Sequence, residues 1–135
     1  MALLHWSPNL SVGIDFMDND HKQLMLLIND LHHAVGGGSA TEIVTEKMDK
    51  LIDFAQRHFT REEKEMEKSN YHWFEHHKRI HEALIEEIVE LRQEFVTGGI
   101  EIGPETTDFL ESWIVSHILE SDKHLGGFLQ GRSSR

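Results

Sequence analysis

The sequence predicts an all-α protein, an up-down-up-down four-helix bundle with an extended N-terminal arm. Four stretches place apolar residues three and four positions apart, which is the spacing of one face of a helix. Short segments rich in Gly or Ser separate these stretches, and antiparallel neighbours in a bundle are joined by such turns. No stretch alternates apolar and polar residues as a half-buried strand would. With 135 residues, we expect one domain spanning residues 1–135.

The arm is expected to cover residues 1–17, because this segment contains Pro8 and Gly13 and has no sustained helical period. Its apolar side chains predict that the arm lies along the bundle and is partly buried. These side chains are Trp6, Val12, Ile14 and Phe16. Asp18 or Asn19 is expected to cap the first helix, at about 19–36. The run Gly36-Gly-Gly-Ser39 should end it, since consecutive glycines are costly inside a helix.

The other three helices are expected at about 41–66, 71–96 and 104–122. The turn Lys68-Ser-Asn70 should reverse the chain between the second and third of the four helices, because Asn tolerates a left-handed backbone. Pro104 suits the first turn of the last helix. The pair Gly126-Gly127 is expected to end the regular structure, and residues 132–135 to fray.

Composition excludes several kinds of site and partner. The chain has no cysteine, so any metal must be held by nitrogen and oxygen atoms. Its formal charge of −11 opposes binding to nucleic acid or to anionic membranes. No long apolar run predicts membrane insertion, and the N-terminus has no signal-peptide pattern. We expect a cytoplasmic protein.

Two pairs of residues point to a metal site in the core of the bundle. His58 and Glu62 are four residues apart, as are His77 and His81, so each pair lies on one helix face. All four replace hydrophobic residues in the inward stripes of two antiparallel helices. Ligands that project inward from facing helices are the usual construction of a metal site in a bundle.

The chain has eleven histidines, and a single histidine on an apolar stripe is more often a hydrogen-bonded core residue than a ligand. Five on the stripes of all four helices change that balance, because burying so many polar groups without a partner would cost several kcal/mol. These five are His21, His58, His77, His81 and His117. The remaining six are expected to be structural or exposed: His5, His32, His33, His72, His76 and His124.

The fourth helix leaves two alternatives open. His117 and Asp122 are five residues apart, so a regular α-helix would separate their directions by about 140°. Either Asp122 lies on the surface, with Glu120 as the competing ligand, or the chain makes a wider π-type turn between them.

Four segments, in this order and at this spacing, resemble the hemerythrin family from about Trp6 through Asp122. They are Val12-Gly-Ile14 with Asp20-His21-Lys-Gln-Leu24, His58-Phe-Thr-Arg-Glu62 with Glu63 and Met66, Tyr71 with His77-Lys-Arg-Ile-His81, and Trp113-Ile-Val-Ser-His117-Ile-Leu-Glu-Ser-Asp122. The chain looks most like the single-domain bacteriohemerythrin type. It departs from the family's frequent Tyr-Pro in having His72 after Tyr71, which affects a helix start and no ligand.

The resemblance implies a non-haem di-iron centre with a bridging oxo or hydroxo group. One iron would take His21 and His58, the other His77, His81 and His117, with Glu62 and Asp122 bridging both. Dioxygen would bind at the iron of His21 and His58, where one coordination position stays open. Ile114 and Trp113 match positions at the oxygen pocket of the family.

The function expected from this resemblance is reversible dioxygen binding, for transport, storage or delivery, with no catalytic residues. A histidine-rich site also favours reversible chemistry, since oxygen-activating di-iron bundles use four carboxylates and only two histidines. The alternatives are an oxygen or redox sensor, a metal-storage module, or a di-iron enzyme such as a ferroxidase or a scavenger of peroxide or nitric oxide. Expected partners are dioxygen and a protein recipient of oxygen or a reductase, and we expect a monomer.

Overall fold

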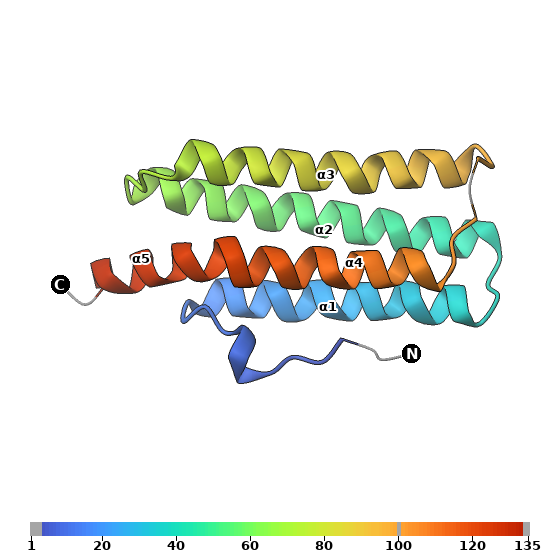
Figure 1. Ribbon diagram of the computed structural model, residues 1–135, viewed down its shortest axis with the longest axis horizontal. Helices are drawn as coiled ribbons and strands as arrows, with labels where there is room; N and C mark the ends of the chain where they lie inside the picture. The colour runs from blue at the N-terminus through green and yellow to red at the C-terminus, as the bar shows by residue number, and fades with distance from the viewer. Residues whose placement is uncertain (1–3, 100, 134–135) are drawn as a thin grey trace.

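The computed structural model describes residues 4–99 and 101–133, and within them it contains helices and no strand (Figure 1). The helices are α1 (Asp15–Gly36), α2 (Thr41–Lys68), α3 (Phe74–Val96), α4 (Pro104–His117) and α5 (Lys123–Ser133). A short 3-10 helix, η1 (Pro8–Leu10), lies in the arm, and a π-helical turn, η2 (Ile118–Asp122), joins α4 to α5. The predicted all-α, four-helix bundle with an N-terminal arm is confirmed.

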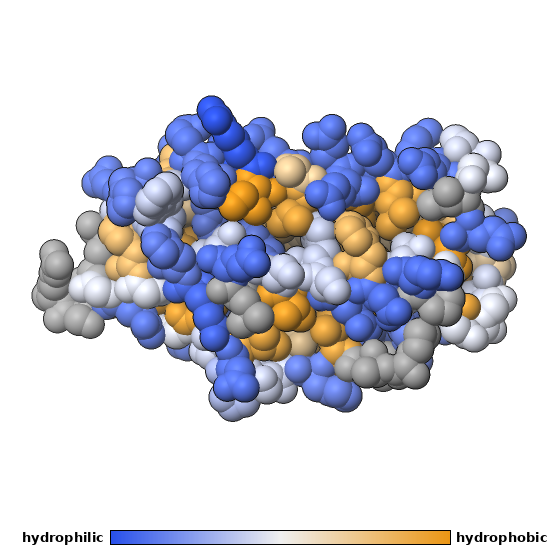
Figure 2. Space-filling view, viewed as in Figure 1, coloured by the Kyte–Doolittle hydropathy of each residue, from blue (hydrophilic) through white to orange (hydrophobic). Residues whose placement is uncertain are grey.

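Apolar stripes from all four long helices build the core. Helix α1 packs against α2 and α4, and α2 packs against α3. Figure 1 shows the four helices lying alongside one another, with α5 continuing the line of α4. Fully buried side chains on three helices include Leu24, Ile28, Met48, Leu51, Leu110 and Ile114. Hydrophilic side chains cover most of the face in Figure 2, with apolar side chains visible between them. No described helix is both long and apolar enough to cross a bilayer.

Helix α1 begins at Asp15, four residues before the predicted start, so the predicted cap at Asp18 or Asn19 was wrong. Asp18 lies in the first turn and accepts hydrogen bonds from the Ser11 hydroxyl at 2.6 Å and the Val12 amide at 2.9 Å. Its carboxylate therefore fastens the arm to the helix instead of capping it. As expected, the arm buries Val12, while Trp6 is only half-buried, beneath the ammonium group of Lys22.

The reversal between α2 and α3 is longer than expected. Helix α2 reaches Lys68, and α3 begins at Phe74, three residues after the predicted start at 71. Asn70 has a left-handed φ of 54°, as its residue type indicated. Tyr71 lies between the two helices with its side chain buried, which makes it part of the core and not of the helix.

The last helix continues past Gly126-Gly127, so the prediction that this pair ends the regular structure was wrong. A Cβ atom on Gly126 would lie only 2.8 Å from Val12 Cβ and would overlap the Val12 carbonyl oxygen. Gly126 thus allows the arm to approach α5 closely. Arg132 and Ser133, expected to fray, are helical, whereas residues 134–135 lie outside the described part.

Candidate metal centre

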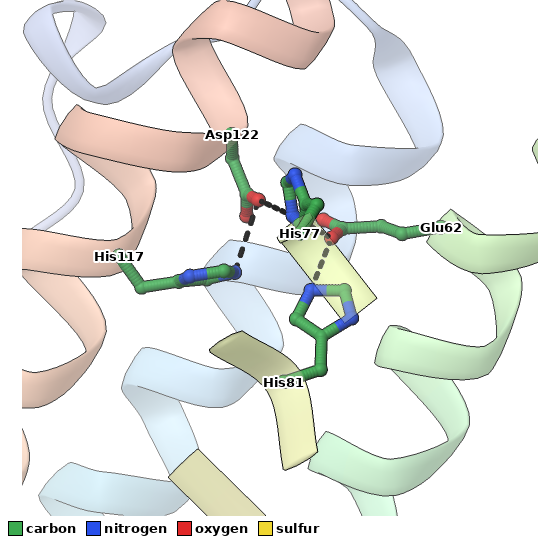
Figure 3. Close-up of side chains that lie close together, drawn as sticks. All are labelled: Glu62, His77, His81, His117 and Asp122. Atoms are coloured by element: carbon green, nitrogen blue, oxygen red, sulfur yellow. Dashed lines mark ion pairs between the residues drawn. The ribbon is translucent and has the colours of Figure 1, made fainter. Parts of the chain in front are cut away.

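The structure brings all seven predicted site residues together in the core of the bundle. Helix α1 supplies one of them, α2 and α3 supply two each, α4 supplies one, and the last residue of η2 supplies the seventh. Their exposed fractions are His21 0%, His58 0%, Glu62 0%, His77 2%, His81 1%, His117 4% and Asp122 0%. Figure 3 shows five of these side chains pointing toward one another from α2, α3, α4 and η2.

Glu62 lies in the middle of the cluster. Its Oε2 atom is 2.8 Å from His58 Nε2. Its Oε1 atom faces the other helix, 3.0 Å from His81 Nε2 and 3.3 Å from His77 Nε2. One carboxylate therefore contacts histidines of two different helices with its two different oxygen atoms.

Asp122 repeats this arrangement from the opposite side. Its Oδ2 atom is 2.7 Å from His21 Nε2, and its Oδ1 atom is 3.0 Å from His117 Nε2 and 3.1 Å from His77 Nε2. Two sets of donor atoms, each within 4.8 Å of one another, result from this geometry. One set holds Glu62, His77, His81, His117 and Asp122, and the other holds His21, His58, Glu62 and Asp122. Both carboxylates belong to both sets.

The π-helical turn explains how Asp122 reaches the cluster. Between Ile118 and Asp122 the helix is wider than an α-helix, so residues five apart can share one face. Asp122 is therefore buried beside His117, while Glu120 is exposed. Of the two alternatives that the spacing left open, the structure adopts the π turn.

The orientation of the donor atoms fits a bound cation. Among the described residues, His58 Nε2, His77 Nε2, His81 Nε2, His117 Nε2 and both Glu62 oxygens are buried without a hydrogen-bond partner. Several of these atoms lie within 3.3 Å of each other, yet they do not align as donor and acceptor. Ligands around an ion are expected to face a common point instead of each other. A bound cation would also offset the free-energy cost of burying these polar atoms.

In the metal-free cluster, protons on the imidazoles occupy the place that a cation would take. Burial lowers the pKa of His77, but the nearby carboxylates of Asp122 and Glu62, at 3.1 and 3.3 Å from its Nε2 atom, outweigh burial and raise that pKa to about 9. Burial likewise opposes ionisation of both carboxylates, yet the surrounding histidines hold the pKa of Glu62 and of Asp122 well below their usual range. Two carboxylate charges are thus balanced by protons on imidazoles, which metal ions can displace.

Two carboxylates outside the cluster fix the orientation of two histidines, and sequence reasoning missed both. The imidazole of His58 donates from Nδ1 to Asp20 at 2.9 Å, and that of His81 donates from Nδ1 to Glu63 at 2.8 Å. These bonds place the proton on the outer nitrogen, which leaves Nε2 free to face the centre. Asp20 also contacts the guanidinium group of Arg61 at 2.8 Å. In the sequence, Asp20 precedes His21 and Glu63 follows Glu62. This adjacency was the one signal that could have indicated their roles.

Replacing Asp20 with asparagine, or Glu63 with glutamine, should weaken metal binding without removing a direct donor. Loss of an outer hydrogen bond of this kind typically lowers metal affinity by roughly 10- to 100-fold. The control is Asp53→Asn, which removes a carboxylate paired with Arg57 on the exposed face of α2. Competition against a chelator of known affinity measures the effect. Equal affinity in Asp20→Asn and Asp53→Asn would contradict the role of the outer carboxylate.

The two predicted pocket residues and the other histidines lie outside the cluster of seven. Trp113 and Ile114 are buried on α4, and Trp113 approaches Phe59, whose ring stacks on His81 with centroids 4.0 Å apart. His32 is buried and hydrogen-bonded to the Thr107 hydroxyl at 3.0 Å, which is a structural role. His33, His72, His76 and His124 are exposed, as is His5.

The fold and the cluster define a four-helix bundle that gathers histidines and carboxylates from all of its helices into one core site. Residues 12–129 match the family described as "Hemerythrin HHE cation binding domain". A bacteriohemerythrin of Methylococcus capsulatus is 35% identical over 127 residues, which cover 93% of this chain and 96% of that one. A bacteriohemerythrin of Pseudomonas aeruginosa is 37% identical over 122 residues, covering 90% of this chain and 78% of that one.

The chain belongs to the hemerythrin family. Its resemblance to bacteriohemerythrins, inferred from the sequence motifs, is confirmed by these matches. The myohemerythrin of Sipunculus nudus is 30% identical over 117 residues, covering 87% of this chain and 86% of that one. A crystal structure of wild-type hemerythrin superposes with a TM-score of 0.89 at 33% identity, covering 95% of this chain and 98% of that one.

Proposed function

We propose that the chain binds dioxygen reversibly at a non-haem di-iron centre, for oxygen transport, storage or delivery. The observation that carries this proposal is the pair of donor sets that share both carboxylates, since two metal ions need ligands that contact both. His77, His81 and His117 would hold one ion, and His21 and His58 the other. Glu62 and Asp122 would contact both ions. The side with two histidines has fewer protein donors, so it is the side that leaves room for dioxygen.

A pair of iron ions would supply a two-electron exchange with dioxygen. The protein's part is to hold the ions, to orient the imidazoles and to keep water out of a core whose seven donor residues are at most 4% exposed. The donor set also favours reversibility. Five neutral imidazoles and two carboxylates leave more positive charge on the ions than the carboxylate-rich sites of oxygen-activating bundles.

The visible spectrum of the reduced, iron-loaded protein, recorded before and after air is admitted and again after oxygen is withdrawn, tests this proposal. Metal analysis of the same sample should find two irons per chain. We expect a nearly colourless reduced form, strong absorption in oxygen and a return on deoxygenation. An iron-loaded sample that does not change colour, or that changes and cannot be reversed even at early times, would favour a di-iron enzyme or a sensor instead.

Metal uptake should become tighter as pH rises through about 9, the pKa of His77 in the metal-free chain, and the raised pKa values of His21 and His58 act in the same direction. Below that pKa the imidazole carries a proton, and a cation can bind Nε2 only by displacing it. Acidification should accordingly release the metal. Calorimetry in buffers of different ionisation enthalpy counts the released protons, and uptake without proton release at neutral pH would contradict the prediction.

Ile114 is proposed to form an apolar wall of the oxygen site. It is fully buried and lies one helical turn before His117. Because apolar walls slow the access of water and protons, Ile114→Ala should speed conversion of the oxygenated protein to its oxidised, oxygen-inert form. Leu110→Ala, one turn earlier on α4 and equally buried, controls for a general loss of packing. The same autoxidation rate in both variants would assign the wall to another residue.

A further inference from the structure

The seven residues of the candidate metal centre are closed off from solvent, so a metal ion needs a route to reach them. None of the seven is more than 4% exposed. In the part of the chain that the structure describes, cavities open to the surface have His77, His117 or His81 in their lining. The question is which of them carries the cation.

The cavity that ends on His77 is lined by side chains that bind metals. It has a volume of about 220 Å³ and lies between the start of α3 and the point where η2 continues into α5. His76, Glu120 and His124 line it and are exposed, so their donor atoms are within reach of a hydrated ion. His77, at its inner end, is also a member of the buried donor set. Imidazole and carboxylate donors thus continue from the surface to the centre.

One contact at this cavity bears on how a histidine could bind a metal. The Tyr71 hydroxyl is hydrogen-bonded to His124 Nδ1. When Nδ1 carries the proton and donates to Tyr71, Nε2 is left as the free lone pair that a metal requires. The ring of Trp73 lies 5.9 Å from His76 and 6.2 Å from His124, measured between centroids, and Trp73 is 46% exposed.

We propose that His76, Glu120 and His124 form a transient capture site for a divalent cation, which passes from there to His77. This inference rests on the proposed metal binding at the buried centre. In the part of the chain that the structure describes, the donor groups within 4.8 Å of one another are the two buried sets, so the capture residues do not form a closed site. A loose site suits this role, because a captured ion must leave again. The formal charge of −11 favours the approach of cations.

The other two cavities are less suited to this role. The one that ends on His81 has a volume of about 510 Å³, but Phe59 stacks on that imidazole and Glu63 occupies its outer nitrogen. The one that ends on His117, of about 410 Å³, shares Glu120 with the cavity of His77 and is otherwise lined largely by apolar side chains such as Leu84, Phe109 and Trp113, with Glu87 as its second carboxylate. It offers a cation no histidine before His117 itself.

The kinetics of metal exchange distinguish a relay from a permanent ligand. Removing a residue that only relays the ion slows release and uptake by the same factor and leaves the equilibrium affinity unchanged. Release from the iron-loaded protein to an excess of chelator gives the first rate, and uptake of Fe²⁺ without oxygen gives the second. For the double variant His76→Gln with His124→Gln, both rates should fall on the order of tenfold, which corresponds to about 1.4 kcal/mol on the barrier.

The matched control is Glu82→Gln with Glu86→Gln, which removes two charges beside the cavity that ends on His81. It should leave both rates near those of the wild type. Equal slowing in the two double variants would show that the route is not confined to the cavity of His77 and would overturn the proposal. Wild-type rates in the histidine variant, or a lower affinity with faster release, would overturn it too. A wild-type chain that loads no metal would instead refute the proposed function.

Fluorescence of Trp73 reports capture directly in the iron-loaded protein. Co²⁺ held by His76 and His124 would quench this ring, because open-shell ions quench nearby indoles. We expect saturable quenching that disappears in Trp73→Phe and in the single variant His76→Gln, whose side chain is exposed and whose loss leaves the core intact. Quenching that never saturates, or that persists in His76→Gln, would overturn the capture site.

Discussion

Replacing Glu62 with alanine will abolish normal metal loading. Glu62 contributes to both donor sets, and its two oxygens face histidines of α2 and α3 at 2.8 and 3.0 Å. Its loss leaves a cluster of buried imidazoles with one carboxylate, so half of the negative charge that faces the two cations is lost. Metal analysis after dialysis against a mild chelator should find well below two ions per chain. His77→Ala should have the same effect.

Glu67→Ala is the matched control, because Glu67 lies on the same helix and is exposed. It should retain the wild-type metal content. If Glu62→Ala also retained full loading, Glu62 would have to be removed from the site. Circular dichroism of each variant separates loss of metal from loss of the fold.

Gly126→Ala should destabilise the protein by about 1–3 kcal/mol, the usual cost of forcing an extra methyl group into a packed region. The added Cβ would overlap the Val12 carbonyl oxygen, so the arm would have to move away from α5. Asp18 holds the arm through Ser11 and Val12, which limits how far it can shift. Thermal or denaturant unfolding measures the loss.

For the neighbouring residue, Gly127, the same substitution should increase stability. A Cβ on Gly127 would meet no atom within 4 Å, and Gly127 lies inside α5. Gly127→Ala should therefore stabilise the protein by up to about 1 kcal/mol, since alanine favours the helix. Similar destabilisation by both changes would mean that close packing against Val12 is not the reason for Gly126.

Helical periodicity was sufficient to predict the bundle and most of the cluster. The inward stripes of α2 and α3 carry His58, Glu62, His77 and His81 at spacings that only a helix brings together. Helix ends were harder, because tertiary contacts decide them. Asp18 has the residue type of a cap, but the arm folds back and uses its carboxylate for docking.

Spacing alone could not place Asp122 or explain Gly126. A five-residue separation from His117 is compatible with a surface position in an α-helix and with a core position in a π turn. The glycine pair has the composition of a helix end, and only the approach of Val12 explains its place within a helix. Asp20 and Glu63 were missed because their roles depend on imidazoles from other helices.

The π turn has a consequence for the angular phase of the chain that follows it. Each residue of an α-helix turns the next by about 100°, so one residue added within η2 rotates the whole of α5 about its axis relative to α4. That rotation determines which side of α5 presents Gly126 to Val12 and which presents Leu125 and Leu129 to the core. The turn that brings Asp122 to the cluster therefore also orients the surface of α5 against which the arm packs. The number of residues in η2, more than their type, thus links the position of Asp122 in the cluster to the packing of the arm on α5.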